Sequence, residues 1–316
     1  MEITTPISEH ISYVYQKASY DVACKRLLSF KIILAYILKY CIDEFKDIDV
    51  NEIAEYYIEG YPQICESAVH VNHSDYIISM NNEDSTFDEG TIYYDIIFYA
   101  IAPYNDELIK LLLNIEAQND FYPGYPLIMR AIYYACRMIS AQYGKEFTKA
   151  NYNQIKKVYS IWICANPPKT KENTITKYEI EEKNIVGYMK EKKNYYDLMT
   201  VIMICLGTPQ ENIEGGVLRL LEVLLSNKRD VEEKKKILAT EFHIKMSEDI
   251  EEEVMKMCNL SEGIEREGIE KGLYQGIKNI MKNLHLDSSQ AMEILGISKE
   301  DYPKYKDMLE RMNEIL

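Results

Sequence analysis

The spacing of apolar residues in the N-terminal part of the chain predicts a long helix and a first strand. Apolar positions recur at helical spacing over residues 21–46, and Asp21 is suited to cap the start of this helix. Residues 51–60 continue as a short amphipathic segment. The apolar residues at 68–80, with one polar interruption, predict a strand, and the polar run 81–90 predicts a loop.

Two runs rich in β-branched and aromatic residues follow, and they predict a hairpin. The runs cover residues 91–100 and 109–118, and the turn-forming sequence PYNDE lies between them. If the chain turns about Asn105-Asp106, position 95 pairs directly with position 116. The hairpin therefore predicts that Asp95 and Glu116 oppose one another.

A loop, a helix and a buried strand are predicted next. The segment 122–126, rich in Pro and Gly, predicts a loop before a long helix over residues 127–143. Residues 158–165 are almost continuously apolar, which is typical of a strand buried on both faces. The order helix, strand, hairpin, helix, strand predicts an α/β fold with a central mixed sheet flanked by helices.

The C-terminal part of the chain predicts helices alone. Residues 186–261 show helical periodicity without strand alternation. Glycines then occur among charged residues, at Gly263, Gly268, Gly272 and Gly276. The last three share one side of a helix, which predicts either a stalk for homo-oligomer formation or a flexible, partly helical linker. Residues 286–316 predict a helical hairpin, with the start of a helix-turn-helix as the alternative.

Length and composition allow one large domain with attachments. The chain has 316 residues, of which 47% are hydrophobic, enough for a sizeable core. The predicted organisation is a core at residues 1–185, a helical extension at 186–261, a glycine-spaced stalk or linker at 262–285 and a hairpin at 286–316.

The net charge and the cysteine content indicate which compartment and which partners to expect. The net charge of −15 has the wrong sign for a protein that coats nucleic acid, but lysines gather within residues 145–193. The seven cysteines form no CxxC motif, which suits reduced thiols in the cytoplasm. The start of the chain lacks the apolar run of a signal peptide, and the longest apolar stretch is too short to span a membrane. We therefore expect a cytoplasmic protein without a membrane partner.

The opposed carboxylates predict a metal site. Like charges directly opposite one another on a hairpin destabilise it, and a divalent cation is the commonest reason for keeping them. Asp95 and Glu116 fit Mg²⁺ or Mn²⁺, with the main-chain carbonyl of Ala117 as a further oxygen ligand. Gln118 lies on the same strand face as Glu116, and Glu44 at the end of the first predicted helix is a candidate ligand or acceptor for metal-bound water.

The sequence also predicts basic residues near the carboxylate pair that could hold a phosphate. Arg130, Tyr134 and Arg137 share one face of the helix after the hairpin. Beside a carboxylate pair, these side chains could bind a scissile phosphate. Lys25 and Lys156 are further candidates for phosphate contact.

Each residue also has a structural explanation. Asp95 could be a lone polar residue at a sheet edge, and Glu116 could form a salt bridge with Arg130. Arg130 and Arg137 could be surface charges, and Glu44 could be solvated. A metal site at His70 and His73 is not expected, because on a strand the two point to opposite faces. The sequence contains no GxGxxG or Walker-type loop that would support nucleotide binding.

Taken in order, these segments resemble the PD-(D/E)XK nuclease family transposases, the Rpn group of recombination-promoting nucleases found in bacteria. The resemblance covers about residues 18–185 and the tail. It is carried by YDVACKRLLSFKIILAYIL, EFKDI, TIYYDIIF, NIEAQ, YPLIMRAIYYACRMISAQ and IKKVYSIWIC, and in the tail by EGIEKGLYQGIKN and AMEILGISKEDYPKY.

The resemblance implies a restriction-endonuclease-like core and metal-dependent cleavage of DNA. Asp95 matches the motif Asp, Glu116 the acidic residue of the (D/E)xK element, and Glu44 the acidic residue of the first helix. Arg130 and Tyr134 fall where some relatives have a Q-x-x-x-Y-like element.

Gln118 departs from the family pattern, since the wider superfamily has Lys at this position. Gln can hydrogen-bond to water but carries no charge. Lys110 shares the strand face but lies about 20 Å away at strand rise. For efficient cleavage, Arg130, Lys25 or Lys156 would have to supply the missing charge. The alternative is a catalytically weakened DNA-binding or oligomeric interaction protein with the same fold.

Overall fold

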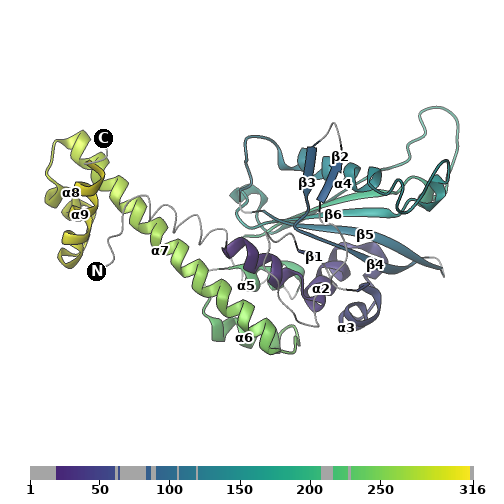
Figure 1. The fold of residues 1–316 in the computed structure, drawn as a ribbon, viewed down its shortest axis with the longest axis horizontal. Helices are drawn as coiled ribbons and strands as arrows, with labels where there is room; N and C mark the ends of the chain where they lie inside the picture. The colour runs from purple at the N-terminus through teal and green to yellow at the C-terminus, as the bar shows by residue number, and fades with distance from the viewer. Residues whose placement is uncertain are drawn as a thin grey trace. The chain divides into compact units, whose positions relative to one another are not determined.

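The computed structural model describes residues 19–60, 63–64, 83–86, 90–104, 107–118, 120–207, 216–226 and 229–313. The chain divides into two compact units, one spanning Val22–Val254 and the other including residues 255–313. The boundary falls inside the helix α7, Glu248–Leu284 (Figure 1). The larger unit contains the sheet and the candidate site.

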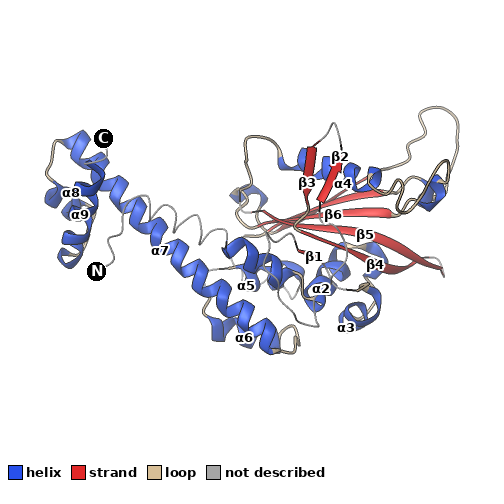
Figure 2. Cartoon of the chain, in the orientation of Figure 1, coloured by secondary structure: helices blue, strands red, loops and turns tan. Residues whose placement is uncertain are grey.

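The larger unit is built on a mixed β-sheet (Figure 2). Its strand order is β1-β4-β5-β6-β8-β7. The strands are β1 (Gln63–Ile64), β4 (Ile96–Tyr104), β5 (Glu107–Gln118), β6 (Lys157–Cys164), β7 (Thr174–Glu179) and β8 (Met199–Cys205). Strands β5, β6 and β8 run parallel, and the outer pairs β1–β4, β4–β5 and β7–β8 are antiparallel. The prediction of a mixed sheet is confirmed.

Helices lie on both sides of this sheet (Figure 1). Helix α4 packs against β6 and β8, and α2, α3 and α5 lie on the other side. Residues 19–28 are also helical. The remaining helical bounds are α2 (Lys31–Cys41), η1 (Asp43–Phe45), α3 (Val50–Glu52), η2 (Ile53–Tyr57), α4 (Leu127–Ser140), η3 (Tyr152–Gln154), η4 (Lys169–Lys171), η5 (Lys193–Tyr195), α5 (Val217–Leu225) and α6 (Val231–Thr240).

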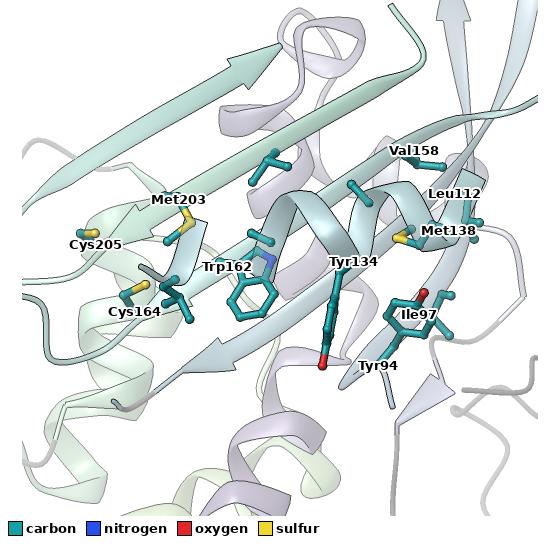
Figure 3. Packing of buried hydrophobic residues seen from close by; sticks show 14 residues of the cluster. Tyr94, Ile97, Leu112, Tyr134, Met138, Val158, Trp162, Cys164, Met203 and Cys205 are labelled. Carbon is teal, nitrogen blue, oxygen red and sulfur yellow. The ribbon is translucent and has the colours of Figure 1, made fainter. Parts of the chain in front are cut away.

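The core beneath α4 contains aromatic and aliphatic side chains from the helix and four strands (Figure 3). Trp162 of β6 is fully buried, and its ring centroid lies 5.5 Å from that of Tyr134 on α4. Met203 of β8 and Leu112 of β5 belong to the same cluster. Burial of this kind contributes about 1.5–3 kcal/mol for each large apolar side chain. The cluster therefore fixes α4 over the strand ends that carry the candidate site.

The predicted hairpin is confirmed, with its register. The pairs run from Ile96↔Ile115 to Tyr104↔Glu107, so two residues connect the strands. Those residues, Asn105 and Asp106, lie outside the described ranges. The long helix after the hairpin and the buried strand β6 are also confirmed.

The prediction that residues 186–261 are purely helical is wrong. Met199–Cys205 form β8, which lies between β6 and β7 in the sheet. A short apolar run buried on both faces shows no alternation, so its sequence resembles that of a buried helix. The run pairs with both neighbours, and this tertiary pairing decides that it is a strand.

Two local predictions near the N-terminus are also corrected. The helix predicted at 21–46 is interrupted at Ser29, whose hydroxyl donates a hydrogen bond to the carbonyl of Arg26 at 2.7 Å. Such a bond gives the backbone an alternative to continued helix. Asp21 lies inside the first helical segment instead of capping it.

The segment 81–90 is not simply a loop. It contains β2 (Glu83–Thr86) and the first residue of β3 (Gly90–Tyr93), and these strands form a separate two-stranded sheet. Mutual backbone pairing from Glu83↔Tyr93 to Thr86↔Gly90 outweighs the weak strand propensity of this polar sequence. The strand predicted at 68–80, with His70 and His73, lies outside the described residues.

The second unit is helical, as predicted. After α7 come α8 (Ser288–Ile294), η6 (Lys299–Asp301) and α9 (Tyr302–Asn313). Ile277, Met292 and Tyr305 are buried together and hold these helices in contact. Gly268 and Gly272 lie within the continuous helix α7. None of the helices in the described ranges has the length and apolar character required to cross a membrane.

Candidate functional site

Asp95 and Glu116 are in direct contact at the start of β4. Continuing the β4–β5 register by one position places Asp95 opposite Glu116. The main-chain N–H of Asp95 donates to Oε1 of Glu116 at 3.1 Å. In return, the N–H of Ala117 donates to Oδ2 of Asp95 at 3.0 Å. Each acidic side chain is thus held by the backbone of the opposite strand.

Glu116 is a buried carboxyl group, with 2% of its surface exposed. Burial raises the pKa of Glu116 well above its ordinary value, and the charge of Asp95 raises it further. The hydrogen bond from Asp95 N–H and the positive charge of Arg130 act in the opposite direction. The site therefore disfavours two negative charges together and favours the binding of a cation.

Lys25, on the helical segment 19–28, reaches the same pair. Its Nζ lies 2.9 Å from Oδ1 of Asp95, and the two side chains are only 12% and 17% exposed. A partly buried pair of this kind is screened less than a surface pair. Lys25 therefore supplies one positive charge at the carboxylates.

Arg130 supplies a second positive charge, from α4. Its Nη2 donates to the hydroxyl of Tyr134 at 3.0 Å, and its guanidinium carbon lies 5.2 Å from the centre of the Trp162 ring. Trp162 is the Cα partner of Glu116 across β5 and β6. Arg130 and Glu116 are therefore neighbours on the face that α4 covers.

Gln118 and Asn114 share this strand face with Glu116. Gln118 is the last residue of β5 and is partly buried. Asn114 is fully buried and lowers the pKa of Glu116, although its amide makes no hydrogen bond of ordinary geometry within the described part of the chain. Asn114 was not among the site residues predicted from the sequence. The available signal was the alternation of Asn114, Glu116 and Gln118 on an otherwise apolar strand.

Glu44 is not brought to this site. Its Oε1 accepts a hydrogen bond from Lys157 at 3.1 Å, and its Oε2 accepts one from the hydroxyl of Tyr159 at 2.7 Å. Lys157 pairs with Leu111, which lies about 17 Å from Glu116 at strand rise. Because the predicted helix ends at Cys41, η1 turns Glu44 toward the start of β6.

Lys156 and Arg137 also lie away from the pair. Lys156 precedes β6, and its main-chain N–H donates to Oε1 of Gln142 at 2.7 Å. Arg137 is buried two helical turns beyond Arg130, and its Nη1 donates to the hydroxyl of Tyr133 at 3.2 Å. Of the predicted cations, the structure thus brings only Lys25 and Arg130 to the carboxylates.

The donor set fits a hard divalent cation. Within the described ranges, no three His, Cys, Asp or Glu side chains come together as a metal-binding group. Mg²⁺ does not require such a group, because one or two carboxylates commonly hold it together with water and substrate oxygens. The pair of partly buried Asp95 and fully buried Glu116 meets this requirement.

Comparison of the chain with known protein families, with curated proteins and with solved structures found no match. The interpretation of the site therefore depends on its own geometry and chemistry.

Proposed function

We propose that this chain is a Mg²⁺-dependent DNA endonuclease with a restriction-endonuclease-like core. One observation carries the proposal: the direct contact between Asp95 and the buried Glu116, with two cationic side chains beside them. The order of helix, acidic hairpin, helix and parallel strand is in keeping with the sequence resemblance. We expect the substrate to be cytoplasmic DNA, and Mn²⁺ to substitute for Mg²⁺.

Asp95 and Glu116 would hold the cation, with the carbonyl of Ala117 near them. When bound, the cation would supply an activated water and neutralise charge on the phosphate. Binding of a cation would require Lys25 to give up part of its contact with Oδ1 of Asp95. Lys25 would then be available as a positive charge for a phosphate at the same site.

Arg130 is arranged to bind a phosphate oxygen. Burial lowers the pKa of Arg130, but contact with Tyr134 and the charge of Glu116 outweigh this effect, so the group stays protonated. The hydrogen bond to Tyr134 limits the motion of the guanidinium group. Gln118, at the end of β5, would orient water by hydrogen bonding.

Plasmid nicking tests this proposal. Wild-type protein should nick supercoiled DNA only with Mg²⁺ or Mn²⁺, and Asp95→Asn and Glu116→Gln should each reduce the rate by at least about 100-fold. Glu232→Gln is the matched control, because this side chain on α6 is 85% exposed. Metal-dependent nicking that persists in both site variants would exclude the assigned residues.

A DNA-binding or interaction protein with weakened catalysis is the second candidate. The observation that favours it is the Lys25–Asp95 ion pair at 2.9 Å, which already compensates one carboxylate without a metal. Gln118, which stands where the wider superfamily has Lys, also favours this second candidate. Titration calorimetry with Mn²⁺ separates the two candidates. If the protein shows neither a heat of Mn²⁺ binding that depends on Asp95 nor cleavage of DNA, the second candidate is supported.

A further inference from the structure

A cavity of about 690 Å³ opens at the edge of the sheet formed by β8 and β7. Phe121, Tyr122 and Tyr125 line it from the loop between β5 and α4, and Tyr178 lines it from β7. Lys171 lines it from η4. The volume lies within the range of about 300–1,000 Å³ typical of small-molecule sites.

The register of the sheet places this cavity near Glu116. Glu116 pairs with Trp162, and Trp162 pairs with Met203, which lines the cavity. Two strand spacings separate Glu116 from Met203, or about 10 Å. Figure 3 shows Met203 and Trp162 on the face covered by α4. Glu116 and the cavity residue Met203 therefore lie on the same face of the sheet, within the span of one nucleotide unit and its base.

Tyr125 and Arg130 connect the two locations. Tyr125 lines the cavity, and its side chain interacts with the guanidinium of Arg130, which also lies beside Glu116. A phosphate on Arg130 would therefore be next to the part of the cavity wall that Tyr125 forms.

The chemistry of the lining suits a flat, aromatic group attached to a phosphate. Tyr122, Tyr125 and Tyr178 are 65%, 44% and 43% exposed, so their rings are available for stacking. The Nζ of Lys171 lies 4.8 Å from the centre of the Phe121 ring, which keeps a positive charge at the wall. Stacking on aromatic side chains strengthens binding for each base and does not depend on which base it is.

We propose that this cavity receives an unpaired nucleobase of the DNA whose phosphate lies at Asp95 and Glu116. This inference rests on the proposed function and makes it more specific. The favoured substrates are single-stranded DNA and duplexes in which one nucleotide is unpaired or extruded. A fully paired duplex has no base free to enter, since each base is stacked and hydrogen-bonded in the helix.

The test is a binding measurement on the full chain in EDTA, which prevents cleavage. The probe is a single-stranded oligothymidylate containing one 2-aminopurine, whose fluorescence falls when it stacks on an aromatic ring. Wild-type protein should bind and quench the probe. Tyr122→Ala should weaken binding by about five-fold or more and reduce the quenching, whereas Tyr122→Phe, which keeps the ring, should retain both.

Tyr152→Ala is the matched control. Tyr152 is 64% exposed and its ring packs on Phe147, much as that of Tyr122 packs on Phe121. It lies in η3, before the start of β6 and at the opposite end of that strand from Trp162. Its substitution should leave binding and quenching unchanged. Tyr178→Ala supplies a second change in the cavity itself, with the same expected loss as Tyr122→Ala.

The outcomes separate this inference from the proposed function. No quenching by wild-type protein, or equal affinity in wild type, Tyr122→Ala and Tyr178→Ala, would overturn the nucleobase pocket. A base-dependent loss in these variants supports it even if wild-type protein with Mg²⁺ cleaves nothing, a result that would remove only the nuclease. Equal affinity for a fully paired duplex and for the single strand would also overturn it.

Discussion

The main-chain amide of Asp95 donates a hydrogen bond to the carboxyl group of Glu116 at 3.1 Å, across the end of the β4–β5 hairpin. This contact joins a partly exposed acid to a buried one. Because Glu116 cannot be solvated, its protonation depends on Asp95, Arg130 and any cation that binds. Stability, metal affinity and catalysis are therefore coupled at this pair.

Stability should fall as pH rises, because of Glu116. The pKa of Glu116 is raised above its ordinary value of 4.5 by burial and by Asp95. Its contribution to stability is thus complete below pH 4.5 and is lost as pH rises through the raised pKa. The loss amounts to about 1.4 kcal/mol for each unit of the shift. Urea unfolding of wild type and Glu116→Gln over this pH range should show the variant gaining relative stability at high pH.

Divalent cations should restore the free energy of unfolding that the wild-type protein loses at high pH, and they should do so in the wild type alone. A cation present at 100 times its Kd adds about 2.7 kcal/mol to the free energy of unfolding. The same addition should leave Glu116→Gln unchanged at pH 8. Equal stabilisation of both proteins would show that the cation binds elsewhere.

Replacing Lys25 should move metal affinity and stability in opposite directions. Lys25→Met removes the ion pair with Asp95 and should lower the free energy of unfolding by about 2 kcal/mol in the absence of metal. Because Nζ no longer competes for Oδ1, calorimetry should show Mn²⁺ binding tighter by about ten-fold. Lys25→Arg keeps the charge and is the control; unchanged Mn²⁺ affinity in Lys25→Met would rule out the competition.

Gln118→Lys should raise the rate of DNA nicking. A positive charge at the end of β5 would stabilise charge on the phosphate, and we expect a gain on the order of ten-fold. Gln154→Lys is the control, since it adds the same charge at an exposed position before β6. An equal gain in both variants would indicate general attraction of DNA instead of a local effect.

Trp162 should report metal binding. It is the single tryptophan of the chain, and it pairs with Glu116 across β5 and β6. Paramagnetic Mn²⁺ at the carboxylates should quench its emission, and Asp95→Asn should abolish the quenching. Quenching that saturates equally in the variant would place the ion away from Asp95.

Glycine substitutions test the predicted self-association. A Cβ at Gly268 or Gly272 meets no atom within 4 Å, so Ala should stabilise α7 by about 1 kcal/mol at each position. At Gly276 a Cβ would lie 3.3 Å from Cδ1 of Leu295, so Ala should stabilise less there. If these glycines mediate close helix approach between copies, Gly272→Leu should lower the mass seen by light scattering. An unchanged mass would remove the stalk hypothesis.

The sequence by itself determined the local features of the site. The turn-forming sequence between the two apolar runs predicted the β4–β5 register, and that register placed Asp95 opposite Glu116. The helical periodicity of α4 and the apolar run of β6 were equally clear. These features depend on residues close together in the chain, whose spacing fixes which side chains share a face.

Tertiary structure decided the rest. Met199–Cys205 became a strand because β6 and β7 offered backbone partners on both sides, which no local pattern records. Glu44 was drawn to Lys157 and Tyr159, while Lys25 reached Asp95, because the break at Ser29 and the turn after α2 changed the directions of these segments. Contacts between residues 70 to 115 positions apart depend on how the elements pack, and sequence spacing carries no information about that.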